Sequence, residues 1–505
     1  MDLIFPGIEK FRNGQNEIIA DVTQQKDVLA VLPTGGGKSL CYQYPSYHLQ
    51  GLVVVISPLI ALMKDQVQSL QSKGLRAGAL YSGQSYEEKK QIFYELSQGG
   101  QYLLYLSPER VQKPGFRTWI QSRKILLFAI DEAHCISQWG HDFREEYTQL
   151  RELKKWRPDV PVLALTASAT PTVLRDIERQ LGLKSPTKRV YGFYRPNLYY
   201  QVQFCEDEIE KNQYLIEALK TFSEGRVIIY CGTRKSTETL HELLSKSFAQ
   251  VDYYHAGLST EKRTQVQNDY IAERTRILIA TNAFGMGIDQ PDVRLVVHYQ
   301  MPANIDSLYQ EMGRAGRDGK ESTCMLLYSK KDKGLQAYFI DSSEATSEIK
   351  STRWDNLDAL IDYCEGSECR HGEILTYYRD SQRIQRCGHC DNCAPLSERR
   401  VVLKNVTPRL TVVKSNKKKS SKELDLVLTP EQEQLFLALK AWRKTVALKK
   451  DAPAFTVLGD KSLRELAIYQ PQNLMALLSI YGFGDSKIKD YGPEVLAIIQ
   501  EWSSF

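Results

Sequence analysis

The sequence predicts an α/β fold with two tandem lobes, each built on a parallel sheet, followed by a helical subdomain with a cysteine cluster and by a small all-α bundle. Short apolar runs recur in two groups within the first 330 residues. Five of the ten cysteines crowd between positions 364 and 393. The final segment has helical spacing. Because 505 residues are too many for one hydrophobic core, the chain should divide into several domains.

The first group of apolar runs predicts the first lobe, residues 1–195. Its runs are "DVLAVL", "GLVVVIS", "QYLLYLS", "KILLFAI" and "VPVLAL". Polar stretches with helical spacing, such as "LIALMKDQVQSLQSKG", separate them. Apolar runs that are continuous, not alternating, are typical of parallel strands with helices on both faces of the sheet.

The second group predicts the second lobe, residues 196–330. After "YRPNLYY" come "RVIIYC", "VDYYHAG", "TRILIAT", "VRLVVHY" and "TCMLLYS". Two such lobes in tandem leave a cleft between them. Open α/β sheets bind ligands at the carboxyl ends of their strands, so we expect the site in this cleft.

The stretch "LPTGGGKS", residues 32–39, predicts a loop that binds phosphate groups. Consecutive glycines let main-chain amides turn toward phosphate oxygens, and a helix that starts near Lys38 directs its positive end to the same place. Lys38 would reach the terminal phosphates, and the Ser39 hydroxyl would hold Mg²⁺. The usual pattern has glycine where this chain has Leu32, so a tight strand-to-helix connection is the alternative. We expect the nucleotide to contact Thr34, Gly35, Gly36, Gly37, Lys38 and Ser39.

Two carboxylates in "AIDEAH" follow another apolar strand of the first lobe. Asp131 suits the ligand shell of Mg²⁺, and Glu132 can polarise an attacking water. An acidic helix N-cap would explain Asp131 alone, but it gives no reason for the phosphate loop at the head of another strand. The two motifs together predict a site that binds and hydrolyses ATP.

Two arginines in "QEMGRAGRDG" belong to the second lobe. Arg314 and Arg317 are three residues apart, which predicts that they share one helical face. Arginines that arrive from an opposing lobe can neutralise charge on the transferred phosphoryl group. Hydrolysis would then depend on closure of the lobes. A solvated basic helix is the alternative.

The clustered cysteines have the spacing of a zinc site. Cys369 is followed by the C-x₂-C-x₂-C pattern of Cys387, Cys390 and Cys393. Four thiolates suit tetrahedral Zn²⁺, and such a site is normally structural. A redox pair is the alternative, and Cys364, His371 and His389 are substitute ligands. The scattered cysteines are expected to be buried apolar residues: Cys41, Cys135, Cys205, Cys231 and Cys324.

The charge and hydropathy of the chain limit the classes of protein to which it can belong. The net charge of +5 is only mildly basic, so it permits nucleic acid as a partner without requiring it. The apolar runs end well short of the roughly 20 residues needed to cross a bilayer, and the start "MDLIFPGIEK" does not resemble a signal peptide. We therefore expect a cytoplasmic protein with no membrane partner.

The motifs stand in an order that resembles superfamily 2 helicases and, within them, the RecQ family of DNA helicases. They are "FRNGQ", "LPTGGGKS", "SPLIALMKDQV", "SPER", "DEAH", "QWGHDFREEY", "LTASAT", "IIYCGTRK", "HAGL", "ATNAFGMGID" and "YQEMGRAGRDG". A leucine before "PTGGGKS" is usual in that family. The resemblance extends to Pro395 and implies that both lobes are RecA-like and that the four cysteines after residue 368 bind zinc.

The resemblance also implies roles for residues that carry no clear signal alone. Arg12 and Gln15 would hold the adenine, to which a glutamine amide can pair through N6 and N7. His134 would link the hydrolysis site to the motor. The remaining implied residues are Ser168 and Thr170, which would transmit the nucleotide state, and Asp289, which would lie near the ribose.

The string "SQWGHDFREEY" is the most discriminating part of the resemblance. Trp139, His141, Phe143 and Arg144 would stack on unpaired DNA bases and report their presence to the hydrolysis site. In isolation the aromatic residues would more often be packing residues. Glu145 stands where relatives commonly carry proline, which removes an expected backbone restraint.

The carboxyl-terminal part departs from many relatives. A lysine-rich stretch, residues 396–424, follows the zinc-binding subdomain, residues 331–395, and predicts a linker too short to include a winged-helix domain. Residues 425–505 resemble the helicase-and-RNaseD C-terminal (HRDC) domain. Glycine turns are expected at 482–484 and 491–492, between short helices that approach a DNA backbone. A bundle that binds protein, or one that is merely structural, is the alternative.

The resemblance implies an ATP-dependent DNA helicase that moves 3′ to 5′ in recombination and repair. Its partners would be single-stranded DNA, branched or tailed duplexes and a single-strand-binding protein. We expect a monomer, associated with the nucleoid if the source is bacterial. The alternatives are a single-strand-stimulated translocase or remodelling ATPase that unwinds weakly, an RNA-specific motor, and a zinc protein that binds nucleic acid without ATPase activity.

Overall fold

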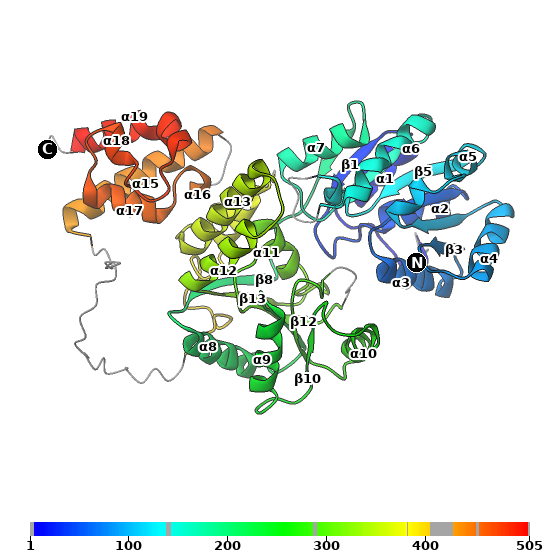
Figure 1. The fold of residues 1–505 in the computed structure, drawn as a ribbon, viewed down its shortest axis with the longest axis horizontal. Helices are drawn as coiled ribbons and strands as arrows, with labels where there is room; N and C mark the ends of the chain where they lie inside the picture. The colour runs from blue at the N-terminus through cyan, green and yellow to red at the C-terminus, as the bar shows by residue number, and fades with distance from the viewer. Residues whose placement is uncertain are drawn as a thin grey trace.

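The computed structural model describes residues 5–137, 143–285, 290–380, 382–403, 428–450 and 454–502. Two α/β lobes follow one another, and a helical region and a separate helical bundle come after them (Figure 1). This architecture confirms the predicted fold class. The chain ends in the bundle, and α13 lies between the bundle and the second lobe (Figure 1).

The first lobe is built on a seven-stranded sheet in which every paired strand is parallel. The strand order is β3-β4-β2-β5-β6-β1-β7. The strands are β1 (Val28–Val31), β2 (Leu52–Ile56), β3 (Ala77–Leu80), β4 (Tyr102–Leu106), β5 (Ile125–Ile130), β6 (Val162–Thr166) and β7 (Thr187–Val190).

Helices cover both faces of this sheet, as the continuous apolar runs predict. In β1, Leu29 and Val31 belong to one core cluster, whereas Val28 and Ala30 belong to another. The helices are α1 (Gln15–Thr23), α2 (Leu40–His48), α3 (Ile60–Ser72), α4 (Tyr86–Ser97), α5 (Phe116–Gln121), α6 (Arg151–Trp156) and α7 (Pro171–Leu181), with short 3₁₀ turns η1 (Pro108–Gln112), η2 (Ala133–Ile136) and η3 (Glu145–Leu150).

The second lobe repeats this plan with a six-stranded parallel sheet of order β10-β11-β9-β12-β13-β8. Its strands are β8 (Leu198–Phe204), β9 (Arg226–Tyr230), β10 (Val251–Tyr254), β11 (Ile277–Ala280), β12 (Val293–His298) and β13 (Ser322–Tyr328). Its helices are α8 (Glu208–Thr221), α9 (Arg234–Leu244), α10 (Thr260–Ile271) and α11 (Ile305–Met312).

The helical region after the second lobe consists of α12 (Lys330–Asp341), α13 (Ser347–Glu365) and α14 (Arg370–Tyr377). The chain then returns to the second sheet, where Cys390 forms an isolated parallel bridge with Tyr200 of β8. Val401 is buried beside β8, and its main-chain amide and carbonyl both bond to the Gln201 side chain. The first residues of the predicted linker are therefore packed against the second lobe.

The bundle contains α15 (Pro430–Lys450), α16 (Ala454–Val457), α17 (Asp460–Tyr469), α18 (Leu474–Leu477) and α19 (Asp485–Trp502). Gly482 has the left-handed φ of 76° that the predicted turn requires. The turn predicted at 491–492 was wrong, because both residues lie within α19. Gly492 serves close packing instead, since a Cβ there would lie 2.8 Å from Leu474 Cδ2.

The bundle contacts the helical region through polar side chains. Lys440 Nζ donates to Ser367 Oγ at 2.7 Å, and Lys333 Nζ donates to the Tyr481 hydroxyl at 3.0 Å. Inside the bundle, Arg443 and Asp460 form a buried ion pair of 2.7 Å beside this contact. Among the described residues, none of the helices combines the length and the apolar character that a bilayer crossing requires.

Candidate nucleotide site and metal centre

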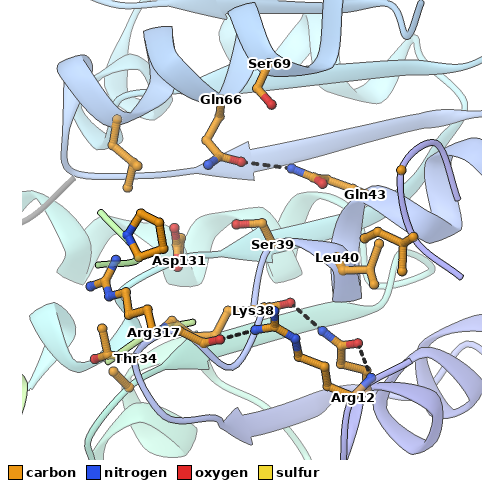
Figure 2. Close-up of a pocket in the computed structure, with 18 of the residues that line it drawn as sticks. Arg12, Thr34, Lys38, Ser39, Leu40, Gln43, Gln66, Ser69, Asp131 and Arg317 are labelled. Carbon is orange, nitrogen blue, oxygen red and sulfur yellow. Dashed lines mark hydrogen bonds between the residues drawn. The ribbon is translucent and has the colours of Figure 1, made fainter. Parts of the chain in front are cut away.

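A cavity of about 940 Å³ opens between the two lobes. The first lobe contributes Asp131, Glu132 and the phosphate-loop residues Thr34, Gly35, Gly37, Lys38 and Ser39, but not Gly36, whereas the second contributes Arg314 and Arg317. Figure 2 shows Arg317 and Thr34 on one side of this cavity, with Asp131 nearby. The sequence-predicted phosphate, carboxylate and arginine motifs thus line one space.

The phosphate loop has the backbone that its glycines allow. Gly35 and Gly37 have left-handed φ values of 77° and 76°, which other residues adopt only with strain. The following helix, α2, begins at Leu40 with Ser39 as its N-cap. The loop therefore turns immediately before a helix N-terminus, the arrangement that favours bound phosphate.

The "FRNGQ" segment holds this loop from one side. Gln15 Nε2 donates to the carbonyls of Gly36 and Gly37 at 3.2 and 2.9 Å, and Gln15 Oε1 accepts from the Arg12 amide at 2.7 Å. The Arg12 guanidinium donates to the Gly35 carbonyl. Both residues support the loop backbone, and their contact with adenine stays a prediction.

The carboxylates follow β5, as its apolar run predicts. Asp131 is buried, and its Oδ1 accepts the main-chain amide of Glu132 at 3.0 Å. Burial and the neighbouring Glu132 carboxylate raise the pKa of Asp131 to about 7, whereas Lys38 opposes this rise. Glu132 has a φ of 47°, so its backbone is held in the strained left-handed region beside the site.

His134 connects these carboxylates to the segment that follows β6. Its Nδ1 lies 2.9 Å from Thr166 Oγ1 and 3.4 Å from Glu132 Oε2. Thr166 Oγ1 in turn donates to the Ser168 carbonyl at 3.0 Å. Thr170 is the N-cap of α7. A continuous contact path therefore joins Glu132 to the "SAT" residues.

The predicted helix bearing the two arginines ends too early to carry them, so the prediction of a shared helical face was wrong. α11 ends at Met312, and turns follow. Arg314 is buried, and its guanidinium donates to the Gly285 carbonyl. Arg317 packs on the phosphate loop, because a Cβ at Gly35 would lie 3.2 Å from Arg317 Cγ.

The predicted DNA-contacting loop is only partly described. Trp139 and His141, and likewise Asp289 of "GMGID", lie outside the described residues. Phe143 is 38% exposed, unusually high for a phenylalanine that packs in a core. Arg144 donates its main-chain amide to the Cys135 carbonyl at 2.8 Å, which fixes the end of the loop beside η2.

Sequence reasoning missed Tyr147, the last residue of "REEY". Its side chain is fully buried, and its hydroxyl donates to the main-chain carbonyl of Asp131 at 2.9 Å. Its amide donates to the Arg144 carbonyl at 3.0 Å. Glu145 is the first residue of η3, a position where an acidic side chain favours the helix end.

The four predicted zinc ligands come together. The thiols of Cys369, Cys387, Cys390 and Cys393 lie within 4.8 Å of one another. Main-chain amides already donate to two of them, from Gly372 to Cys369 at 3.4 Å and from His389 to Cys387 at 3.3 Å. Such donors stabilise thiolates, so the set fits tetrahedral Zn²⁺.

Of the three substitute ligands, the two histidines lie at the zinc site, whereas Cys364 lies in the hydrophobic core. His371 and His389 approach Cys387 closely enough to form a second potential ligand group. Both rings also contact the Leu198 carbonyl, at 3.1 and 2.9 Å. Cys364 belongs to neither group found among the described residues and is buried in the core. The expected burial is confirmed for Cys41, Cys135, Cys205, Cys231 and Cys324.

Four known family profiles match the chain in the order of its structural units. They are "DEAD/DEAH box helicase" over residues 12–177, "Helicase conserved C-terminal domain" over 210–319, "RecQ zinc-binding" over 330–394 and "HRDC domain" over 432–499. The helicase and zinc profiles cover the phosphate loop, the two carboxylates, Arg314 and Arg317, and the four cysteines of the zinc site.

Individual proteins agree with these matches. An ATP-dependent DNA helicase RecQ of Bacillus subtilis is 34% identical over 98% of this chain and 97% of its own length. A probable ATP-dependent DNA helicase RecS of the same organism is 42% identical over 74% of this chain and 75% of its own. The solved structure of Mycobacterium smegmatis helicase Lhr, bound to ssDNA and AMP-PNP, has a TM-score of 0.53 at 18% identity and covers 71% of this chain and 52% of its own. The Lhr match supports the fold alone. The RecQ match extends over nearly the full length of both proteins at 34% identity, and it shows that this chain belongs to the RecQ family of helicases.

Proposed function

We propose that this chain is an ATP-dependent DNA helicase that moves 3′ to 5′ along single strands and unwinds duplex and branched intermediates of recombination and repair. The cavity between the lobes carries the proposal, because Lys38, Asp131 and Glu132 line it from one lobe and Arg314 and Arg317 from the other. A site that two lobes complete links each hydrolysis event to motion of one lobe against the other. The names of the RecQ relatives support DNA and ATP as substrates.

The side chains divide the chemistry of hydrolysis between them. Lys38 would hold the terminal phosphates of ATP, and Glu132 would orient and polarise the attacking water. Arg317, which packs on Gly35, would neutralise charge on the transferred phosphoryl group, an effect worth about 10³–10⁵ in rate. Arg314 would support this segment through its bond to Gly285 while lining the same cavity.

The oxygen donors in the cavity fit Mg²⁺. The Ser39 hydroxyl and the Asp131 carboxylate would bind it, and both residues line the cavity. Glu132 Oε2 is buried, its contact with His134 Nδ1 is as long as 3.4 Å, and among the described residues it has no hydrogen bond, so it stays available to a water beside the cation. Bound Mg²⁺ would supply positive charge to the phosphates.

The cysteine site would hold structural Zn²⁺. Cys369, Cys387, Cys390 and Cys393 supply four thiols and so fill a tetrahedral shell, which leaves no coordination position for a substrate, the pattern of structural and not catalytic zinc. We propose the domain boundaries 1–195, 196–330, 331–395, 396–424 and 425–505, which the order of sheets, zinc helices and bundle supports.

We further propose that the protein acts as a monomer in the cytoplasm, on the nucleoid if the source is bacterial, together with single-strand-binding protein. A DNA substrate is the support for this placement. A single-strand-stimulated translocase that unwinds weakly is the second candidate. Only residues 395–431 separate the zinc-binding and HRDC matches, too few for a winged-helix domain of about a hundred residues.

The test of the proposal is ATP hydrolysis by the full chain with single-stranded DNA, with RNA and with no polymer. We expect strong stimulation by single-stranded DNA and little by RNA. Equal stimulation by RNA would favour the RNA-specific motor. Hydrolysis absent under all three conditions would leave only a zinc protein that binds nucleic acid, and it would contradict the proposal.

A further inference from the structure

The short linker that joins the two lobes, residues 191–197, is a different segment from the basic linker after the zinc-binding subdomain. It lies beside the nucleotide cavity. It joins β7, which ends at Val190, to β8, which begins at Leu198. Arg195 in its middle is only partly buried, and its guanidinium reaches main-chain carbonyls of both lobes. Through Arg195, this linker therefore contacts both lobes at the place where they meet.

Four carbonyl oxygens surround the Arg195 guanidinium. Nη1 donates to Thr34 of the phosphate loop at 3.2 Å and lies 3.4 Å from the Gly313 oxygen. Nη2 donates to Ala315 at 2.9 Å and to Gly316 at 3.1 Å. One side chain thus ties the phosphate loop of the first lobe to the turn that carries the arginines of the second.

The main-chain carbonyls of this turn are groups that an arginine side chain binds especially well. α11 ends at Met312, so the carbonyls after it lack helical partners and carry the negative end of the helix dipole. A guanidinium presents several donors in a fixed fork and is always charged, so it can serve carbonyls from two directions at once. A lysine ammonium lacks that fork.

The lobes touch at the same place. A Cβ at Gly313 would lie 3.0 Å from Thr34 Cβ, so the turn and the phosphate loop are in van der Waals contact. Asn197 holds the turn from the other side, because its Nδ2 donates to the carbonyls of Gly316 and Lys320 at 2.9 Å each. Unlike Arg195, Asn197 contacts only the second lobe through these bonds.

The helical zinc region fixes the linker around Arg195. The Phe193 amide donates to Asp380 Oδ2 at 3.0 Å, and the Phe193 ring stacks on Tyr378 with centroids 4.1 Å apart. The Tyr194 hydroxyl lies 2.8 Å from Nε2 of His389, a residue between two of the zinc ligands. The contacts of Phe193 and Tyr194 with the helical zinc region therefore hold the backbone of Arg195 in place.

We infer that Arg195 is a positioning residue for ATP hydrolysis, which sets the turn bearing Arg314 and Arg317 against the phosphate loop when the lobes meet. The inference rests on the proposed ATPase function. Arg195 touches main-chain carbonyls on both sides and not the reacting atoms. Its loss should leave each lobe folded but misplace the arginines relative to the phosphates, and misplacement by about 1 Å can cost about 100-fold in rate.

The test compares Arg195→Ala and Arg195→Lys with the wild-type chain at saturating single-stranded DNA. We expect kcat for ATP hydrolysis to fall by about 10- to 100-fold in Arg195→Ala, with KM for ATP changed by less than about threefold, because the first lobe alone holds the ground-state phosphates. Arg195→Lys should recover part of kcat. Binding of ADP with aluminium fluoride, a mimic of the transferred phosphoryl group, should weaken far more than binding of ADP.

Arg399→Ala is the matched control. Arg399 also donates to main-chain carbonyls beside the linker, those of Asn197 and Ser322, at 2.6 Å each, but these bonds do not reach the phosphate loop. It should keep kcat within about twofold of the wild-type value. An Arg195→Ala variant with wild-type kcat, or with ADP and ADP–aluminium fluoride weakened equally, would overturn the inference. Absence of hydrolysis in the wild-type chain would instead contradict the proposed function.

Discussion

The Tyr147 hydroxyl donates a hydrogen bond of 2.9 Å to the main-chain carbonyl of Asp131. Tyr147 comes only four residues after Phe143, and its amide bonds to the Arg144 carbonyl at 3.0 Å. The segment predicted to contact DNA bases is therefore attached to the backbone of a carboxylate predicted to bind Mg²⁺. A shift of this segment on a DNA strand would be transmitted directly to the hydrolysis site.

Removing only this hydroxyl should uncouple DNA from hydrolysis. In Tyr147→Phe the ring still fills its buried site, but the Asp131 carbonyl loses its donor, at a cost of about 1–3 kcal/mol. We expect hydrolysis without DNA to stay within about threefold of wild type, whereas its stimulation by single-stranded DNA falls severalfold further. Tyr299→Phe, which removes a 2.9 Å hydroxyl bond to Asn212 in the second lobe, is the control. An equal fall with and without DNA would refute the coupling role.

Replacing both Trp139 and Phe143 with alanine should separate binding from coupling. Most DNA affinity should come from lysine and arginine contacts to phosphates, so binding should weaken by a few kcal/mol at most, since stacking is worth about 1–3 kcal/mol per base. ATP binding should remain intact, while DNA-stimulated hydrolysis falls nearly to the DNA-free rate. Titration of DNA against both binding and hydrolysis checks this. Full hydrolysis at saturating DNA would mean that the loop only helps to grip the strand.

Loss of one zinc ligand should destabilise the protein. A structural thiolate site can contribute about 10–16 kcal/mol at neutral pH, comparable to the stability of a whole domain. Cys390 is fully buried, and its main chain forms a β-bridge with Tyr200 of β8. Cys390→Ser should therefore give insoluble or protease-sensitive protein. Cys205→Ser changes a buried cysteine outside the site and should be far milder. Elemental analysis of the wild-type chain should find zinc, and a folded chain without it would show that the site is misassigned.

Asp362 should make the contact between α13 and the bundle depend on pH. Burial raises the pKa of Asp362 to about 7 from an unfolded value near 3.8; Asp358 and Glu365 add to the rise, and Lys487 and Arg443 oppose it. A Cβ at Gly459 of the bundle would lie 2.1 Å from Asp362 Oδ1, so the carboxyl is at the contact. A raised carboxyl pKa favours the folded state most below pH 4, and this contribution is lost as pH rises to about 7.

The variant Asp362→Asn keeps the shape of the neutral carboxyl at every pH. It should already be more stable than wild type at pH 5, by at most about 1.7 kcal/mol, because the unfolded carboxyl ionises above about pH 3.8, and its gain should be larger at pH 8. The gain at pH 8 should reach at most about 4 kcal/mol, because a raised pKa costs about 1.4 kcal/mol of stability for each pH unit between its unfolded and folded values. Glu348→Gln, on the exposed face of the same helix, should show no such pH-dependent gain. If Asp362→Asn changes stability equally at both pH values, Asp362 does not titrate in this range.

Local motifs allowed much of the site to be predicted. The glycines of the phosphate loop, the carboxylates after β5 and the C-x₂-C-x₂-C spacing each carry their chemistry within a few residues, and the structure brings each group together. The ten apolar runs assigned to strands are strands, because both faces of each sheet are covered. Three strands were missed, β3, β7 and β8; of these, the edge strand β7, "TKRV", is polar and only partly buried.

What the sequence did not reveal depends on contacts between distant segments. Arg195 bonds to main-chain carbonyls, which leave no pattern in the sequence of their own residues. The same bonds, with Gly316 at a left-handed φ of 53°, explain why α11 stops before Arg314. Helical spacing alone would have continued that helix. Gly492 likewise looked like a turn, but it serves the approach of α18 to α19.

Strand separation driven by ATP is the most direct test of the whole account. The measurement is unwinding of a duplex with a single-stranded 3′ tail, beside one with a 5′ tail, by the wild-type chain and by Lys38→Ala. We expect the wild-type chain with ATP and Mg²⁺ to separate the 3′-tailed duplex and not the 5′-tailed one. Lys38→Ala should bind both duplexes with wild-type affinity and separate neither, because Lys38 serves the phosphates and not the strand. DNA-stimulated hydrolysis without separation of either duplex would identify a translocase, and unwinding by Lys38→Ala at the wild-type rate would contradict the account.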